Sequence, residues 1–249
     1  MSAWHDGVSP PGQDAGLVEA AVSASGEALP GGRSRGGTRK VVVAGRAVVV
    51  RRLRRGGALR AFLPDLFLDG GRGERERSVT ARALAAGIPV VEVLGVRTRR
   101  RWGTLGLLHE IHVVTPHVEA PDVLAHLLGG GGAAPELCRS AARAVASLAR
   151  AGILHRDLQA GNLLWREAAG ACLVLDLDRA REGVAPGAAA REMALRLGRS
   201  IAKWGLARRA VSRAARMRFL RVLSREGGLP WEDVRAWMRL RPGGGRRWA

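Results

Sequence analysis

Runs of β-branched residues dominate the first half of the chain and predict strands. Residues 40–44 (Lys-Val-Val-Val-Ala) and 47–51 (Ala-Val-Val-Val-Arg) are separated by two residues, one of them glycine, which is typical of a β-hairpin. Apolar runs at residues 90–96 and 105–114 predict two further strands. Residues 1–24 contain Gly, Pro and Ser and show little pattern, so we expect a flexible N-terminus there.

Helical spacing of apolar residues occurs once in the first half and prevails in the second. Residues 74–86 predict a helix, because Gly87 and Pro89 follow it as they commonly follow a helix end. Pro116 is expected to end the strands and to act as a hinge. Beyond it the pattern predicts helices over residues 122–128, 135–151, 188–204, 208–226 and 231–240.

These patterns divide the chain into four parts. We expect a β-rich lobe over residues 25–115 and a helical lobe over residues 116–240, with a flexible N-terminus over residues 1–24 and a loose basic tail over residues 241–249. A chain of 249 residues with 47% apolar residues is large enough for two such lobes.

The most informative stretch is residues 155–162, His-Arg-Asp-Leu-Gln-Ala-Gly-Asn, which is followed by a short hairpin and an apolar run that contains Asp176. Phosphoryl transfer needs a carboxylate to orient the attacking hydroxyl and oxygen ligands to hold metal ions on the nucleotide. Asp157, Asn162 and Asp176 supply these groups in the order and spacing that a kinase catalytic loop requires. Each residue alone also fits an ordinary turn or strand end. Their joint occurrence predicts a phosphoryl-transfer site.

A glycine-rich turn precedes the predicted hairpin and is a weaker candidate. Gly36 and Gly37 could direct backbone N–H groups at phosphate oxygens. Glycine is abundant throughout this chain, so an ordinary surface turn explains the same residues equally well.

The net charge is +19, and nearly all of it comes from arginine, since Lys40 and Lys203 are the only lysines. A charge of this size attracts polyanions such as nucleic acid, anionic lipid headgroups or phosphorylated glycans. The whole chain is rich in Ala, Gly and Arg, and this compositional bias weakens the charge as evidence of function. The local motifs therefore have to choose among these partners.

The sequence contains no apolar run of the roughly 18 residues that a membrane span requires. Its first residues lack the basic start and apolar segment of a secretory signal. Cys138 and Cys172 have no metal-ligand spacing, and we expect them to be buried free thiols in a reducing compartment. These observations favour a cytoplasmic location.

Several segments together resemble the bacterial lipopolysaccharide-core kinases, and among them the 3-deoxy-D-manno-octulosonic acid (Kdo) kinases of the protein-kinase-like superfamily. The resemblance covers roughly residues 30 to 205. It implies an α+β, two-lobed, protein-kinase-like fold, with a small antiparallel β N-lobe that contains one helix, a hinge and a helical C-lobe. The segments that carry it are residues 50–57 (Val-Arg-Arg-Leu-Arg-Arg-Gly-Gly), 87–90 (Gly-Ile-Pro-Val), 154–158 (Leu-His-Arg-Asp-Leu), 176–180 (Asp-Leu-Asp-Arg-Ala) and 196–203 (Arg-Leu-Gly-Arg-Ser-Ile-Ala-Lys).

The resemblance implies ATP and Mg²⁺ as cofactors and gives each motif residue a role. Asp157 would be the catalytic aspartate that takes the proton of the acceptor hydroxyl. Asn162 and Asp176 would be oxygen ligands of Mg²⁺. Asp178 would add a metal or substrate contact or pair with its neighbour in the chain. His155 is a further candidate, although a histidine here is also explained as a satisfied core or turn residue.

The phosphate-binding position departs from the kinase pattern. Arg51 stands where a lysine is usual, and arginine binds phosphate in a different geometry. Arg52 and Lys40 are alternative occupants of this role. The acidic partner on the following helix is best matched by Glu76, with Glu74 as the alternative.

The acceptor is expected to be a small molecule or a glycolipid. Gln159 replaces the lysine that protein kinases carry two residues after the catalytic aspartate, and no Ala-Pro-Glu follows Asp176. We therefore expect an ATP-dependent kinase that phosphorylates a Kdo or other inner-core sugar hydroxyl, with Kdo-lipid A or a related anionic glycolipid as acceptor and no nucleic acid partner. The alternatives are an aminoglycoside- or choline-type phosphotransferase and a catalytically silent, kinase-like basic binding protein.

An acceptor of this kind predicts a peripheral location on the cytoplasmic face of the inner membrane. The arginine-rich helices between residues 191 and 241 carry Trp204, Phe219, Leu220 and Trp231, and such a mixture suits docking on an anionic membrane surface. A core face combined with a solvated basic face explains the same pattern.

Overall fold

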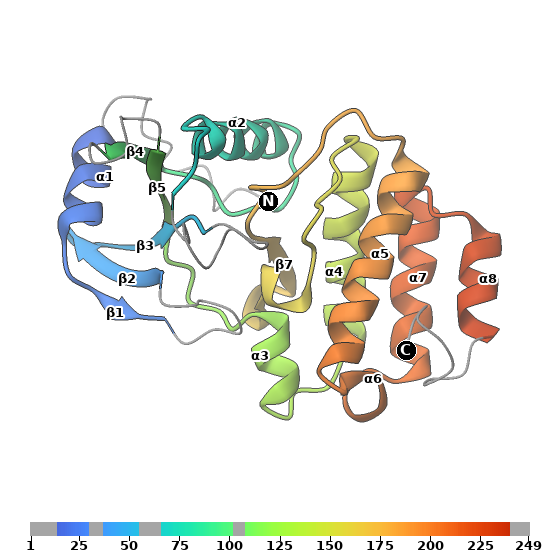
Figure 1. The fold of residues 1–249 in the computed structure, drawn as a ribbon. Coiled ribbons are helices and arrows are strands. Elements are labelled where there is room, and N and C mark those ends of the chain that lie inside the picture. Colours follow the sequence, from blue (N-terminus) through green and yellow to red (C-terminus); the bar gives the residue numbers. More distant parts are fainter. Residues whose placement is uncertain (1–13, 30–36, 55–65, 102–107, 240–249) are drawn as a thin grey trace. The chain divides into compact units, whose positions relative to one another are not determined.

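The computed structural model describes residues 14–29, 37–54, 66–101 and 108–239 (Figure 1). Its contacts divide the chain into two compact units. Unit 1 comprises Met1–Ser78 and Glu92–Val118, and unit 2 comprises Val79–Val91 and Glu119–Ala249. The boundary after Val118 lies close to the hinge expected at Pro116, but a short segment before the hinge belongs to the second unit.

Unit 1 is built on a five-stranded antiparallel sheet with the order β1-β2-β3-β5-β4. The expected hairpin is present as β2 and β3, and the two turn residues Ala44 and Gly45 both have positive φ angles of 48° and 74°. Such turns match the natural twist of paired strands. The strands are β1 (Glu27–Ala28), β2 (Thr38–Val43), β3 (Arg46–Arg52), β4 (Gly95–Arg101) and β5 (Leu108–Pro116).

A helix packs on this sheet where we expected a flexible N-terminus. Helix α1 (Asp14–Ser23) buries Val18, Ala21 and Val22 in one cluster with valines of β2, β3 and β5. The sequence pattern hides this helix, because its apolar residues are small and the segment before it is rich in Gly and Pro. The expectation of a flexible N-terminus over residues 1–24 is therefore wrong for residues 14–23.

The apolar run at residues 90–96 is a connector for most of its length and not a strand. Strand β4 starts only at Gly95, while Val90, Val91 and Val93 are buried. A buried apolar run does not by itself distinguish a strand from a packed connector. Strand β5 ends with Pro116, which is itself the last paired residue. A proline fits at this position because Pro116 pairs only with Val48 of β3 and has no partner in β4.

Helix α2 (Arg72–Ala85) is the helix expected between the hairpin and the later strands. Its residues up to Ser78 belong to unit 1, and the rest belongs to unit 2. Val79 and Ala83 are buried in the core cluster of unit 2.

Unit 2 is mostly helical. Helix α4 (Pro135–Arg150) lies beside α5 (Pro186–Lys203) and α7 (Arg213–Gly227), and α8 (Trp231–Arg239) packs against α7 (Figure 1). The apolar faces of these helices form one core. The remaining helices are α3 (Val123–Leu128) and the short α6 (Leu206–Arg209). No described helix is both long and apolar enough to cross a bilayer.

A two-stranded hairpin completes unit 2. Strand β6 (Leu163–Arg166) follows a 3₁₀ turn, η3 (Ala160–Asn162), and pairs with β7 (Ala171–Val174). The N–H of Val174 donates to the C=O of Pro89 at 2.8 Å, and the N–H of Val91 donates to the C=O of Val174 at 2.9 Å. These bonds attach the connector after α2 to the hairpin.

Both cysteines are buried free thiols in unit 2. Burial raises the pKa of Cys172 to about 12 and also raises the pKa of Cys138.

Candidate functional site

The loop that carries Asp157 and the strand end that carries Asp176 are joined by a closed ring of hydrogen bonds. The N–H of Asp157 donates to Nδ1 of His155 at 3.3 Å, and Nδ2 of Asn162 donates to the C=O of Asp157 at 2.9 Å. The N–H of Leu175 donates to the C=O of Asn162 at 2.9 Å, and Nε2 of His155 donates to the C=O of Leu175 at 3.0 Å. Because Asp176 follows Leu175 directly, the ring brings all three candidate segments together.

His155 closes this ring as a neutral imidazole. One ring nitrogen accepts from an N–H and the other faces a C=O, so the bonds require a proton on Nε2 and none on Nδ1. The side chain is fully buried, and burial lowers its pKa, although Asp176 and the C=O of Leu175 act in the opposite direction. His155 therefore positions the site and needs no charge.

The orientation of the Asn162 amide is fixed by the same ring. Since the C=O of Asp157 can only accept, the amide nitrogen of Asn162 must point at it, and the amide oxygen points away. The carboxylate of Asp157 takes no part in the ring, which uses only the backbone of that residue. An amide oxygen and a carboxylate are thus presented from one short loop.

Asp176 has a φ angle of 61°, one of two positive values outside glycine in the part of the chain that the structure describes. The left-handed region is strained for most residues and is tolerated best by Gly, Asn and Asp. Such backbone strain is often found at functional sites. The turn continues with Leu177, whose C=O accepts from the N–H of Ala180 at 2.9 Å.

Helix α5 supports the loop from the side. The N–H of Ala160, the first residue of η3, donates to Oγ of Ser200 at 3.2 Å. Ala160 is fully buried, so this N–H has no access to water. Because Asn162 is the last residue of the same turn, Ser200 helps to fix its position. Sequence reasoning included Ser200 in a resembling segment but assigned it no role.

The segment after Asp178 is attached at two points. Leu154 and Arg181 exchange backbone hydrogen bonds at 2.8 and 2.9 Å, directly before the loop that carries Asp157. Glu182 accepts from Nε and from a terminal nitrogen of Arg82 on α2, at 2.8 and 2.5 Å. Asp178 lies along the chain after Asp176 and before these two attachments, and its side chain is half-buried.

In unit 1 the structure brings Arg51 and Glu76 together. A terminal nitrogen of Arg51 lies 2.5 Å from Oε1 of Glu76, and Glu76 is only 2% exposed. The alternative acid, Glu74, is exposed and pairs with Arg77 one turn along the same helix at 2.7 Å. Of the two candidate acids, Glu76 is the one that meets the candidate arginine.

The two alternative cations occupy different faces of the sheet. Side chains alternate along a strand, so Arg52 points to the face opposite Arg51, where it pairs with Glu110 at 3.2 Å. Lys40 pairs in register with Val49, two residues before Arg51, and therefore shares the face of Arg51. Lys40 and Arg51 are the two candidates on one face.

Of the two glycines that are candidates for phosphate binding, the structure describes only one. Gly36 lies outside the described residues. Gly37 lies directly before β2, and its C=O accepts from the N–H of Arg52 at 2.9 Å.

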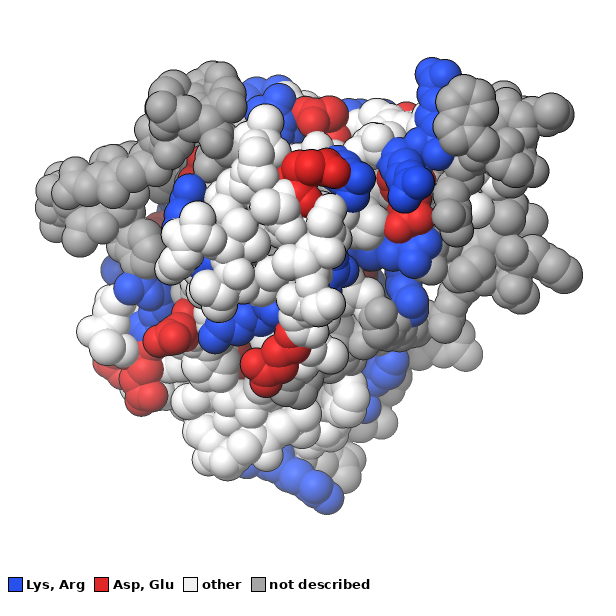
Figure 2. Space-filling view, turned by 90° about the vertical axis from the view of Figure 1, so that its left-hand side faces the viewer, with Lys and Arg blue, Asp and Glu red and all other residues white. Residues whose placement is uncertain are grey.

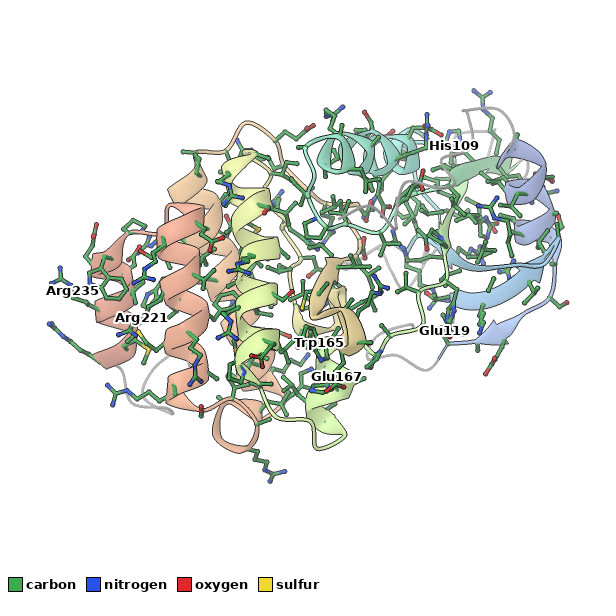
Figure 3. All side chains as sticks on the ribbon, turned by 180° about the vertical axis from the view of Figure 1, so that it is seen from behind. His109, Glu119, Trp165, Glu167, Arg221 and Arg235 are labelled. Atoms are coloured by element: carbon green, nitrogen blue, oxygen red, sulfur yellow. The ribbon has the colours of Figure 1, made fainter. Side chains whose placement is uncertain are left out.

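A shallow cavity of about 310 Å³ lies at the outer end of the β6–β7 hairpin in unit 2, and none of the candidate residues lines it. Its lining residues include Glu119, Trp165 and Glu167, which are labelled in Figure 3. It is separate from the hydrogen-bonded ring.

Three comparisons with known proteins complete the description. The family model described as "Lipopolysaccharide kinase (Kdo/WaaP) family" matches residues 20–222. A search of curated proteins gave no significant match. Among solved structures, the chain is similar to one titled "WaaP in complex with acyl carrier protein", with 20% identity, a TM-score of 0.57 and coverage of 90% of each chain. At this identity the likeness shows the fold alone.

These findings confirm the expected α+β kinase-like fold and the resemblance read from the sequence. The family match covers most of the chain and includes Asp157, Asn162 and Asp176. The chain belongs to the lipopolysaccharide kinase (Kdo/WaaP) family.

Proposed function

We propose that this chain transfers the γ-phosphate of ATP to a hydroxyl of a Kdo or other inner-core sugar on a lipopolysaccharide precursor. Membership of the family makes the chain a kinase of lipopolysaccharide biosynthesis in the coarser sense. The observation that carries the finer proposal is the hydrogen-bonded ring, which joins the segments of Asp157, Asn162 and Asp176.

Asp157 is the group that would act on the acceptor. Its carboxylate accepts a hydrogen bond from the sugar hydroxyl and takes the proton as the hydroxyl oxygen bonds to the γ-phosphorus. The bond from that phosphorus to the bridging oxygen breaks, and ADP leaves. Because the ring holds Asp157 by its backbone alone, its side chain is available for this role.

Asn162 and Asp176 fit Mg²⁺ by their chemistry. The amide oxygen of Asn162 is turned away from the ring, and Asp176 contributes a carboxylate from a turn that fixes its backbone. Mg²⁺ prefers such hard oxygen ligands, and when bound it neutralises charge on the nucleotide phosphates. These two residues would hold the ion.

Arg51 is our candidate for contact with the ATP phosphates in unit 1. Glu76 orients its guanidinium group through the 2.5 Å ion pair, and arginine can bind phosphate oxygens bidentately. Lys40 shares this face and is the second candidate. Arg52 is a poor candidate, because it lies on the other face with Glu110.

The acceptor that this proposal names is Kdo-lipid A or a related anionic glycolipid, reached from the cytoplasmic face of the inner membrane. The net charge of +19 supports an anionic acceptor and an anionic membrane surface.

The test is product analysis with purified chain, Mg²⁺, labelled ATP and Kdo-lipid A. Asp157→Asn should lower kcat by at least about a thousandfold with little change in Tm, since the carboxylate is not part of the ring. Asp122→Asn is the matched control. Asp122 caps α3 by accepting from the N–H of Ala125 at 2.7 Å, and Asn caps equally well, so activity should persist.

Three results would contradict the proposal. Equal labelling by wild type and Asp157→Asn would show that the Asp157 carboxylate takes no part in the transfer. Turnover of soluble aminoglycosides or choline without turnover of the glycolipid would favour a small-molecule phosphotransferase. Binding of Mg²⁺-ATP without transfer to any acceptor would favour a silent kinase-like protein.

A further inference from the structure

Helices α7 and α8 carry exposed arginines at helical spacing. Arg218, Arg221 and Arg225 recur every three or four residues on α7, and Arg235 and Arg239 are four residues apart on α8. Figure 3 shows Arg221 and Arg235 on these two neighbouring helices, away from the hairpin. We call this set, together with Trp231, the arginine stripe. Its members are Arg218, Arg221, Arg225, Trp231, Arg235 and Arg239.

The stripe is the solvent side of α7 and α8. The opposite side of α7 buries Phe219, Leu220 and Leu223, and α8 buries Val234 and Trp237. Phe219 and Leu220 therefore belong to the core and do not help to dock the protein on a membrane. Of the two interpretations that the sequence left open for them, a core face beside a solvated basic face is the one that the structure shows.

The arginines of the stripe have no carboxylate partners among the described residues. The nearby acids pair with arginines that lie outside the stripe. Glu226 of α7 pairs with Arg143 at 3.5 Å, and Asp233 of α8 pairs with Arg191 at 3.0 Å. Glu232 is exposed at the start of α8 and offsets only part of the charge. The stripe thus keeps a positive excess that the fold does not neutralise.

Two other surfaces of the molecule carry cations and acids side by side. On the face that Figure 2 presents, lysines and arginines lie beside aspartates and glutamates. Helix α4 shows the same mixing, since Arg139 pairs with Glu136 at 2.6 Å. Compositional bias toward arginine explains many cations, but it does not explain why five exposed arginines share this surface with one exposed acid, Glu232.

Trp231 gives the stripe an apolar component. It is 42% exposed and lies one turn before Arg235 on the same side of α8. An indole ring prefers the boundary between headgroups and acyl chains, and arginine binds lipid phosphates through paired N–H groups. A nucleic acid or an acidic protein would also satisfy the charge, and bases can stack on a tryptophan. The membrane is favoured here because the proposed acceptor is anchored in one.

We infer that the arginine stripe docks the protein on anionic lipid headgroups of a membrane. The inference rests on the proposed function, because an acceptor anchored in a membrane makes such attachment useful. It goes beyond that function in assigning the contact to the solvent faces of α7 and α8. The attachment is peripheral, since the stripe lies on the surface of packed helices.

The experiment is sedimentation of the full chain with vesicles of phosphatidylcholine, alone or mixed with phosphatidylglycerol, without ATP or acceptor. Wild type should bind only the anionic vesicles. Arg221→Glu/Arg235→Glu should bind them at least about 30-fold more weakly, because each arginine near an anionic membrane contributes roughly a factor of five. Trp231→Ala should weaken vesicle binding less than Arg221→Glu/Arg235→Glu does, and by the same factor at low and at high salt concentration.

Arg99→Glu/Arg100→Glu is the matched control, since it changes the net charge equally at exposed positions of β4 in unit 1. Equal losses in both double variants would reduce the effect to net charge and overturn the assignment. Retained vesicle binding by Arg221→Glu/Arg235→Glu, with loss only of poly-glutamate binding, would assign the stripe to an acidic protein and also overturn it. Phosphorylation of a soluble Kdo acceptor should be equal in wild type and the stripe variant, which separates a failure of docking from a failure of the proposed kinase activity.

Discussion

The two units hold their candidate residues by different means. In unit 1, Arg51 and Glu76 come from a strand and a helix, and a single ion pair joins them. In unit 2, a ring of four hydrogen bonds aligns the site. Each of the four bonds has a backbone N–H donor or a backbone C=O acceptor, and the ring joins one loop to one strand end. The ring does not include the carboxylate of Asp157, so we expect this loop to tolerate changes of that side chain, whereas the ion pair is lost when either partner is removed.

The largest effect should follow from breaking the ion pair. Glu76→Ala removes the buried carboxylate that pairs with the Arg51 guanidinium, so the positive charge of Arg51 loses this partner. This change should lower the free energy of unfolding by about 3 kcal/mol. Chemical denaturation measures this directly. Arg51→Met/Glu76→Leu should recover most of the stability, since a buried pair can be replaced by apolar side chains, but it should not recover phosphate transfer.

Glu74→Ala is the control on the same helix. Glu74 and Arg77 form an exposed pair, so its loss should change the free energy of unfolding by less than about 0.5 kcal/mol. Similar costs for Glu74→Ala and Glu76→Ala would contradict the distinction between the two acids.

A somewhat smaller effect should follow from opening the ring at His155. His155→Phe leaves the C=O of Leu175 and the N–H of Asp157 without their buried partner and should cost about 2 kcal/mol or more. Its pH dependence is more specific. The pKa of His155 is lowered in the folded state, so below about pH 6.5 the unfolded chain takes up a proton that the folded chain refuses.

Stability linked to His155 is therefore present above about pH 6.5 and is lost as the pH falls below it. The slope of this loss is at most about 1.4 kcal/mol per pH unit. Urea denaturation of wild type and His155→Phe at several pH values should show a shallower acid loss in the variant. Parallel curves would mean that His155 is not held neutral by the fold.

The smallest effect should come from Ser200, which supports the ring from outside. Ser200→Ala removes the acceptor for the buried N–H of Ala160 and should cost about 1 kcal/mol. Because Asn162 ends the same turn, the Mg²⁺ concentration for half-maximal rate should rise by a few-fold, and Ser200→Thr should restore it. A loss of stability with unchanged Mg²⁺ dependence would leave Ser200 with a structural role only.

That Asp157, Asn162 and Asp176 lie near one another was predictable, because the first two share one loop and a short hairpin leads to the third, while their roles in catalysis stay a prediction. A hairpin returns the chain to the place where it began, and β6 and β7 form such a hairpin between Asn162 and Asp176. Helices α4 and α5 were also predictable, since they begin and end within two residues of the expected bounds, whereas the helix expected over residues 208–226 is broken and α7 begins only at Arg213. Local periodicity explains the helices, and short separation along the chain explains why the three candidate residues lie near one another.

Contacts between distant segments were not predictable in the same way. Pattern alone left Arg51, Arg52 and Lys40 as alternatives, and only the register of β3 with its neighbours separates their faces. The link from Ser200 to Ala160 spans 40 residues and leaves no periodic signal. The N-terminal helix α1 escaped notice because it is stabilised by packing on the sheet and not by a strong pattern of its own.

The buried cysteines have a practical consequence for experiments on this molecule. Cys138 and Cys172 are shielded, and with their pKa values raised they carry almost no thiolate at neutral pH. Maleimide reagents should therefore leave both native thiols unmodified in the folded chain. A fluorophore or spin label attached through Arg235→Cys would then report from one known position, with no need for a cysteine-free background.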